Sequence, residues 1–342
     1  MISNKKSIKL LSGMLLLMLM LMLIIVVTGC SGSSSDTEGK SGGIVPIYSP
    51  GVGGTNYVIS TGIGKLLDDS GELPDTKLST QSTNGSSEIV KSVSDDYKKG
   101  SDAFGTPASD IATRMYEGDW KPFPGEFDEI AAVARISYAA NHIVVPQKSS
   151  IESFADLEGK QVGMAPEGSS PYNFMTTLLE EEYDLVVGDD YEAIPMGNPD
   201  IQDGIRDGSL DVGVLTGSVP ASLVTELSST DKIKLISADE KEMDTFLEKY
   251  PYYDSLKVEA GTYPDQDEEI IVGFFQTMLM THEDTDEDTV YTILKELWDN
   301  ADDLKEIHPD FEIEEETILD GIEIPLHPGA EKFYEEEGIL EE

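Results

Sequence analysis

The sequence is poor in cysteine, in arginine and in basic residues as a whole. Cys30 is the only cysteine among 342 residues, so an intramolecular disulfide is excluded and no second thiol is available for catalysis or metal binding. The chain has three arginines, and 23 basic residues stand against 67 acidic ones, giving a formal net charge of −44. Because no basic patch can neutralise phosphates, nucleic acid and anionic lipid are poor partners.

The signatures of common catalytic and cofactor sites are also missing. Residues 62–65 (GIGK) resemble the end of a phosphate loop, but Ile59 and Leu66 occupy the positions of the required Gly and Ser or Thr. A calcium-loop spacing of aspartates at residues 284–288 fails because Thr289 stands where the turn needs Gly. The four histidines are scattered, and no GxSxG elbow, which needs a preceding strand, is present for a serine nucleophile. We therefore expect no cofactor, no metal site and no enzymatic activity.

The N-terminus has the pattern of a lipoprotein signal peptide. Three lysines precede an apolar run of 14 residues at 14–27, and a Thr-Gly-Cys triplet follows, ending at Cys30. The run is shorter than the roughly 20 residues that a transmembrane helix needs. We predict a cleaved signal over residues 1–29, a lipidated Cys30 that anchors the protein outside the cell membrane, and a flexible tether over residues 30–43.

The acidic excess grows when the predicted signal is removed. Residues 1–29 contain three lysines and no acidic residue, so the formal charge falls from −44 to −47. Such a charge repels itself unless salt screens it, over about 3 Å at molar ionic strength. We therefore expect a halophilic or salt-tolerant source, and the excess of lysine over arginine favours a bacterium.

After the tether, short β-like runs alternate with helical patterns. Residues 44–49 and 77–82 have the composition of strands, and each is followed by a glycine turn. Apolar residues then recur at helical spacing over 59–67 and 89–97. This order predicts an α/β fold with a parallel sheet covered by helices. Further strands are expected at 129–137, 140–146, 160–165, 210–216, 233–237 and 269–281, and a helix at 286–304.

Three segments rich in glycine and hydroxyl residues each follow a predicted strand and precede a predicted helix. They are residues 51–57, 83–88 and 166–173, and Thr216 follows another strand. Small residues let an anion approach the amides of a helix N-terminus, and ligands of α/β sheets bind at the carboxyl ends of strands. The segments predict an anion site, although each one alone is also the ordinary composition of a turn and a helix cap.

Six runs spread along the mature chain carry a resemblance to a known family. They are GVGGTNYVISTGIGKLL (51–67), NGSSE (84–88), DAFGTPASDIATRMYEG (102–118), SFADLEGKQVGMAPEGSS (153–170), DGIRDGSLDVGVLTG (203–217) and IPLHPGAEKFYEEEG (324–338). With these runs the chain resembles the TAXI family, the extracytoplasmic receptors of one branch of the tripartite ATP-independent periplasmic (TRAP) transporters, over essentially the whole mature chain. Two departures lie near the expected pocket: Asn56 replaces a usual aromatic residue, and Pro107 stands where a polar residue is common.

The resemblance implies a two-lobed, periplasmic-binding-protein-like fold of type II, with a ligand cleft between the lobes. One lobe would comprise residues 44–137 and 269–342, and the other residues 138–268. It further implies a monomeric receptor that captures a small carboxylate, glutamate-like or another organic acid, and delivers it to a TRAP permease with fused small and large subunits. The binding subunit of an ATP-driven importer and a sensor lipoprotein that presents ligand are the alternatives.

The expected ligand-binding residues come from loops of both lobes. Main-chain amides and hydroxyls would hold the carboxylate, while two tyrosines would pack against the carbon skeleton of the ligand. The set is Gly53, Gly54, Thr55, Tyr57, Gly85, Ser86, Thr106, Tyr138, Gly168, Ser169, Ser170, Asn173 and Thr216.

The three arginines have different surroundings. Arg114 and Arg206 lie in polar stretches and are expected to pair with nearby aspartates. Arg135 lies in the apolar run 129–137, where an unpaired buried charge would be costly. Arg135 therefore either pairs with an acidic group inside its lobe or points into the cleft as a bidentate clamp for the ligand carboxylate.

Overall fold

A single mixed β-sheet connects the elements of the described part of the chain. The computed structural model describes residues 43–52, 54–230 and 233–340. Across these residues ten strands join in the order β2-β1-β3-β10-β4-β7-β5-β6, while β8 pairs with β4 and β9 with β10. The strands are β1 (Gly43–Ser49), β2 (Thr76–Ser82), β3 (Phe104–Gly105), β4 (Ile130–Pro146), β5 (Gln161–Met164), β6 (Glu192–Pro195), β7 (Val212–Gly217), β8 (Ile233–Ile236), β9 (Tyr253–Val258) and β10 (Ile270–His282).

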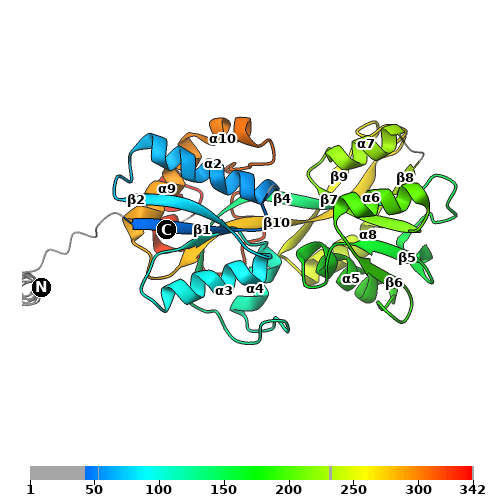
Figure 1. Cartoon of the computed structure of the whole chain (residues 1–342), viewed down its shortest axis with the longest axis horizontal. Coiled ribbons are helices and arrows are strands. Elements are labelled where there is room, and N and C mark those ends of the chain that lie inside the picture. Colours follow the sequence, from blue (N-terminus) through cyan, green and yellow to red (C-terminus); the bar gives the residue numbers. More distant parts are fainter. Residues whose placement is uncertain (1–42, 53, 231–232, 341–342) are drawn as a thin grey trace, which may run out of the picture. The chain divides into compact units, whose positions relative to one another are not determined.

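Parallel strands linked by helices form both ends of this sheet. β1 pairs in parallel with β2 and β3, and β5 pairs in parallel with β6 and β7. We call β1–β3 with their helices the first half and β5–β7 with theirs the second half (Figure 1). The helices are α2 (Thr55–Ser70), α3 (Ser86–Tyr97), α4 (Ser109–Tyr116), η1 (Phe154–Leu157), α5 (Ser170–Tyr183), α6 (Asn198–Asp207), α7 (Ser222–Thr230), α8 (Glu240–Lys249), α9 (Glu287–Asp299), α10 (Ala301–Ile307) and α11 (Pro328–Glu337).

Two long antiparallel strands, β4 and β10, join the halves. They have 17 and 13 residues, and their pairing runs from Phe274 opposite Ala140 to His282 opposite Ile130. The last residues of β4 pair instead with β7 and β8 in the second half. The prediction of separate strands at 129–137 and 140–146 is wrong, because no turn-forming residue interrupts the chain between them and it continues as one strand.

The apolar core divides according to the two faces of the sheet. Side chains alternate between faces along a strand, so the neighbours Phe274 and Phe275 on β10 belong to different clusters. One face carries a cluster shared by both halves, formed with α3, α4, α5 and α8. The opposite face carries one cluster formed with α2, α9, α10 and α11 and another formed with α6 and α7. Consequently α2 and α3 cover opposite faces although they follow adjacent strands.

The helix predicted over residues 286–304 is two helices, so that prediction is wrong in part. α9 ends at Asp299 and α10 begins at Ala301, with Asn300 between them at φ −122° and ψ 26°. The side-chain amide of Asn300 donates a 2.9 Å hydrogen bond to the carbonyl of Glu296, which satisfies one acceptor in the last turn of α9. Leu304 is buried with the apolar stripe of α9, which is why periodicity alone predicted one helix.

The predicted signal peptide, Cys30 and most of the tether lie outside the described residues. Gly43, predicted as the last tether residue, is instead the first residue of β1. Strand β9 was not predicted from the sequence. Among the described residues, no helix combines the length and the apolar character needed to cross a membrane.

Candidate functional site

Two cavities lie on opposite faces of the β4–β10 pair. Tyr138 lines one and its neighbour Ala139 lines the other, as the alternation of side chains along a strand requires. The α2–α7 cavity, about 850 Å³, is bounded by the start of α2, by residues 216–223 before and in α7, and by residues 305–314. The α3–α5 cavity, about 960 Å³, is bounded by residues 84–88 at the start of α3 and 166–171 at the start of α5.

Three helices begin at the wall of the α3–α5 cavity. Gly85, Ala108 and Ser169 are the N-cap residues of α3, α4 and α5, and all three line the cavity. In the described structure no side chain of these three residues accepts a hydrogen bond from a backbone N–H in the first turn of its own helix. The positive ends of three helix dipoles therefore lie at one cavity, which is an environment that favours an anion. First-turn residues of α3 and α5 line the cavity, whereas residues 109–111 at the start of α4 are fully buried. α3 and α4 come from the first half, and α5 comes from the second.

The serine hydroxyls at these helix starts already have partners within the protein. The Oγ of Ser86 accepts a 3.0 Å hydrogen bond from the backbone N–H of Ala108, which ties α3 to α4. Ser169 donates its hydroxyl proton to the carbonyl of Pro166 at 2.6 Å, and Ser170 donates its own to Asp110. Ser169 and Ser170 use their protons internally, whereas the oxygens of Ser86 and Ser87 act as acceptors, so the donors left for a ligand are the main-chain amides and the hydroxyl protons of Ser86 and Ser87.

Asn56 connects the start of α2 to both long strands at this cavity. Its side-chain amide donates to the Oγ1 of Thr277 at 3.1 Å, and its Oδ1 accepts from the hydroxyl of Ser137 at 2.9 Å. Asn56 and Thr277 both line the α3–α5 cavity. Asn56, the polar residue that departs from the TAXI pattern, therefore connects α2 to β4 and β10 through side-chain hydrogen bonds beside this cavity.

The α2–α7 cavity has a different character. The ring of Tyr138 packs against Phe274 with centroids 5.1 Å apart, and burial raises the pKa of Tyr138. Thr216 donates its hydroxyl proton to Asn141 at 3.1 Å. Lys305, the basic residue among the lining residues, is paired with Glu314 at 2.7 Å, and further carboxylates at 310 and 312 line the same wall. The lining thus has one lysine and three carboxylates, the same balance as in the α3–α5 cavity, so the side-chain charge does not distinguish the two cavities.

The structure divides the predicted ligand-binding residues between the two cavities. Thr106 is fully buried and its hydroxyl lies 3.2 Å from those of Ser49 and Ser60, so it joins β1, β3 and α2 in the core. Gly53 lies outside the described residues. Gly54, Thr55, Tyr138 and Thr216 line the α2–α7 cavity, Gly85, Ser86, Gly168, Ser169 and Ser170 line the α3–α5 cavity, and among the described residues Tyr57, Thr106 and Asn173 line neither.

Other residues of the α3–α5 cavity were not predicted. Ala139 on β4, and Phe275 and Thr277 on β10, form part of its lining, together with Phe123 from the loop after α4. Side chains alternate along a strand, so Ala139 must face the side of the sheet opposite to Tyr138. Among these four residues, this alternation is the one sequence signal that could have predicted a lining residue. The loop position of Phe123 carries no such signal.

Arg135 makes ion pairs inside the first half. Its Nη2 lies 2.5 Å from the Oε2 of Glu312, its Nη1 lies 3.4 Å from Asp320, and its side chain is 5% exposed. The sequence left two roles open, an ion pair inside the lobe and a clamp for the ligand carboxylate, and these contacts correspond to the ion pair. Arg114 pairs with Asp119 at 3.0 Å and Arg206 with Asp203 at 2.8 Å, as predicted. In the part of the chain that the structure describes, no group of three or more His, Cys, Asp or Glu side chains could hold a metal ion.

Comparison with solved structures establishes the class of fold. A TctC solute binding protein from Polaromonas is similar with a TM-score of 0.51 at 14% identity, over 81% of this chain and 91% of that one. MatC from Rhodopseudomonas palustris with bound malate has a TM-score of 0.48 at 15% identity, over 78% and 88% of the two chains. The periplasmic aliphatic sulphonate binding protein SsuA from Escherichia coli has 0.47 at 13%, over 77% and 72%. The protein has the α/β fold of periplasmic solute-binding proteins, so the predicted fold class is confirmed.

The family follows from the sequence. The model of the NMT1-like family matches residues 47–338, and the chain belongs to this family.

Proposed function

We propose that the protein is an extracytoplasmic solute-binding receptor that holds a small carboxylate in the α3–α5 cavity. The family and the solute-binding fold support a receptor. The observation that carries the choice of ligand and site is the convergence of the first turns of α3, α4 and α5 on one cavity. Binding there needs positioned donors and no reacting group, so the proposed activity is capture and release without catalysis.

The proposed lobes are residues 44–137 with 269–342, and residues 138–268. One boundary falls within β4 and the other just before β10, and these are the two strands that pass between the halves. α3 and α4 would then belong to one lobe and α5 to the other, so a ligand bound to all three helix starts would stabilise the closed arrangement of the lobes. The closed form would be the one that docks on a membrane transporter.

The proposed transporter is a TRAP permease with fused small and large subunits, and the proposed anchor is a lipidated Cys30. The runs that resemble the TAXI family support the first, and the signal pattern before Cys30 supports the second. The gene neighbourhood tests the partner: a permease with many membrane helices and no adjacent ATPase is expected. An adjacent ATPase would favour an ATP-driven importer instead, and an adjacent membrane kinase would favour a sensor.

Ligand binding is tested by native mass spectrometry of the purified protein, followed by a thermal-shift screen of amino acids, keto acids and dicarboxylates. A ligand present at a hundred times its dissociation constant stabilises the folded state by about 2.7 kcal/mol. We expect at least one carboxylate to raise the melting temperature, while the matching neutral amide has no effect.

A pair of variants tests the location. Ala139→Asp places a negative charge on the floor of the α3–α5 cavity and should weaken binding of the carboxylate at least tenfold. Ser222→Asp places the same charge in the α2–α7 cavity, at the first residue of α7 and on an exposed position, and serves as the matched control. The opposite result, with loss of binding in Ser222→Asp alone, would move the site to the α2–α7 cavity.

A further inference from the structure

We infer that the α3–α5 cavity selects an organic anion with one charged group and an apolar body, and that it discriminates against dicarboxylates. This inference rests on the proposed function, because it describes the ligand of the same cavity.

Much of the lining is apolar and held in place by the core. Phe275 on β10 is 7% exposed and pairs in register with Ala139 on β4, and both side chains line the cavity. Phe123 lines it from the loop after α4 and packs against the same apolar cluster. Pro166 and Pro171 flank the start of α5. A ligand with an apolar body can cover these groups, whereas a short molecule with polar groups at both ends would leave them against water or against charge.

The charged residues of the lining offer no partner to a second anionic group. Lys91 is the cationic side chain among the lining residues, and its ammonium lies 2.5 Å from the carboxylate of Asp95, one helical turn further along α3. The arginine guanidinium groups are engaged elsewhere, in the pairs with Glu312, Asp119 and Asp203. A second carboxylate brought into this cavity would lose water without gaining a cation, which costs free energy.

Two further carboxylates lie close to the helix starts on either side of the cavity. Glu88 is the third residue of α3 and accepts hydrogen bonds of 2.8 Å from the backbone and side-chain amides of Asn84. Glu167 is exposed and lies three residues before Ser170, the first residue of α5. Both line the cavity. The helix starts therefore attract one anionic group, while the carboxylates beside them repel another.

The test is a calorimetric titration of the purified protein at constant ionic strength. The compounds are 4-methylpentanoate and 3-phenylpropanoate, the dicarboxylates glutarate and malate, the sulfonate of the phenylpropyl body, and the neutral amide of each monocarboxylate. We expect a monoanion with an apolar body to bind at least tenfold more tightly than either dicarboxylate, and the amides not to bind. A dicarboxylate that binds as tightly as or more tightly than every monoanion would overturn the inference and leave the proposed function standing. If none of the anions binds, both fail.

Variants separate the two contributions. Glu167→Gln should narrow the preference for the monoanion over glutarate at least threefold, because one repelling carboxylate is removed. Glu314→Gln, which changes a carboxylate of the α2–α7 cavity, is the matched control and should leave the preference unchanged. Phe123→Ala should weaken the binding of 3-phenylpropanoate at least fivefold and the binding of acetate less than twofold. Equal preferences in wild type and Glu167→Gln would contradict the electrostatic part of the inference.

Discussion

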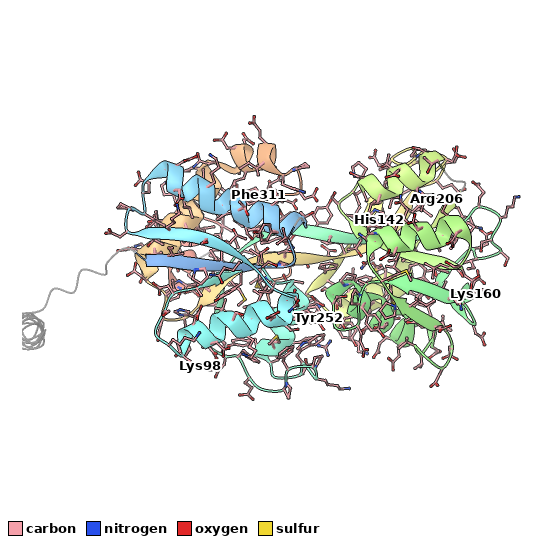
Figure 2. All side chains as sticks on the ribbon, viewed as in Figure 1. Lys98, His142, Lys160, Arg206, Tyr252 and Phe311 are labelled. Atoms are coloured by element: carbon pink, nitrogen blue, oxygen red, sulfur yellow. The ribbon has the colours of Figure 1, made fainter. Side chains whose placement is uncertain are left out.

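The hydroxyl of Tyr253 on β9 donates a 2.9 Å hydrogen bond to the carboxylate of Asp110 on α4, which is fully buried. The other oxygen of Asp110 accepts from Ser170 at the start of α5, so one carboxylate ties an element of the first half to two elements of the second. The ring of Tyr252 packs edge-on against Tyr253 at 4.8 Å beside this junction (Figure 2). Removing the donor should leave a buried acceptor short of a partner.

Tyr253→Phe should therefore lower the free energy of unfolding by about 1–3 kcal/mol. Urea denaturation of wild type and variant measures the difference. Tyr172→Phe is the control, because Tyr172 lies on α5 and is half-buried. A variant as stable as wild type would show that the hydrogen bond to Asp110 contributes nothing.

Asp110 should also make stability depend on pH. Burial raises the pKa of its carboxyl above the ordinary 3.8, against the hydrogen bonds from Ser170 and Tyr253, which lower it. The stabilising contribution of a group with a raised folded pKa is fully present below about pH 3.8 and is lost as the pH rises through the folded pKa. In Asp110→Asn this dependence is absent, so the stability of the variant relative to wild type should increase as the pH is raised from 4 to 7. A constant difference across that range would contradict the assignment.

His142 should give a pH dependence of the opposite sign. His142 is fully buried on β4 (Figure 2), and the hydroxyl oxygen of Tyr263 lies 2.7 Å from its Nε2. Burial lowers the pKa of His142 from 6.5 to about 4. His142 becomes protonated in the unfolded chain at a higher pH than in the folded protein. The free energy of unfolding therefore decreases by about 3 kcal/mol in total as the pH falls from about 6.5 to 4. His142→Gln should remove this slope. The difference in unfolding free energy between the two proteins, measured at half-unit pH steps, tests it.

Arg135→Gln should destabilise the fold and spare ligand binding. The change leaves the carboxylates of Glu312 and Asp320 without their cation, but their side chains are 23% and 45% exposed, so water partly replaces it and the expected cost is about 1–3 kcal/mol. Arg206→Gln disrupts the exposed pair with Asp203 and should cost less than about 1 kcal/mol. Normal stability combined with lost binding in Arg135→Gln would instead identify a ligand clamp.

Salt should stabilise the protein, since 67 acidic residues face 23 basic ones. Raising sodium chloride from dilute buffer to 1 M should increase the free energy of unfolding in urea by more than the ~1 kcal/mol that an exposed ion pair contributes. A neutral osmolyte at equal osmolality is the control for exclusion of solutes from the surface. Unchanged or reduced stability in salt would rule out a halophilic adaptation.

The fold was more predictable from the sequence than the site. Composition and the following glycine turns located β1 and β2, and hydrophobic periodicity located α2 and α3 because each helix buries one face. It failed where one apolar stripe spans two elements, as at Asn300, and where one strand crosses two halves, as in β4. Those outcomes depend on which neighbours each stretch finds in the folded protein.

The site residues were predicted to share one cleft, whereas the structure distributes them between cavities on opposite faces of the sheet. The starts of α2 and α3 have similar sequences, yet the helices cover opposite faces of the sheet, so Thr55 and Ser86 line different cavities. The face of each helix follows from the strand order, because the right-handed connections from β1 to β2 and from β2 past β1 to β3 run in opposite directions, and that order was not predicted. The acidic partners of Arg135 lie in residues 312–320, far along the chain, and local sequence could not identify them either.

The central claim is that an anionic ligand is held by the starts of α3, α4 and α5. The most direct measurement is a crystal structure of the protein with the carboxylate or sulfonate that gives the largest thermal shift. We expect the anionic group of the ligand to lie within hydrogen-bonding distance of main-chain amides in the first turns of at least two of these helices. The apolar body of the ligand should pack against Phe275. An anionic group bound in the α2–α7 cavity, or held by Arg135, would contradict it.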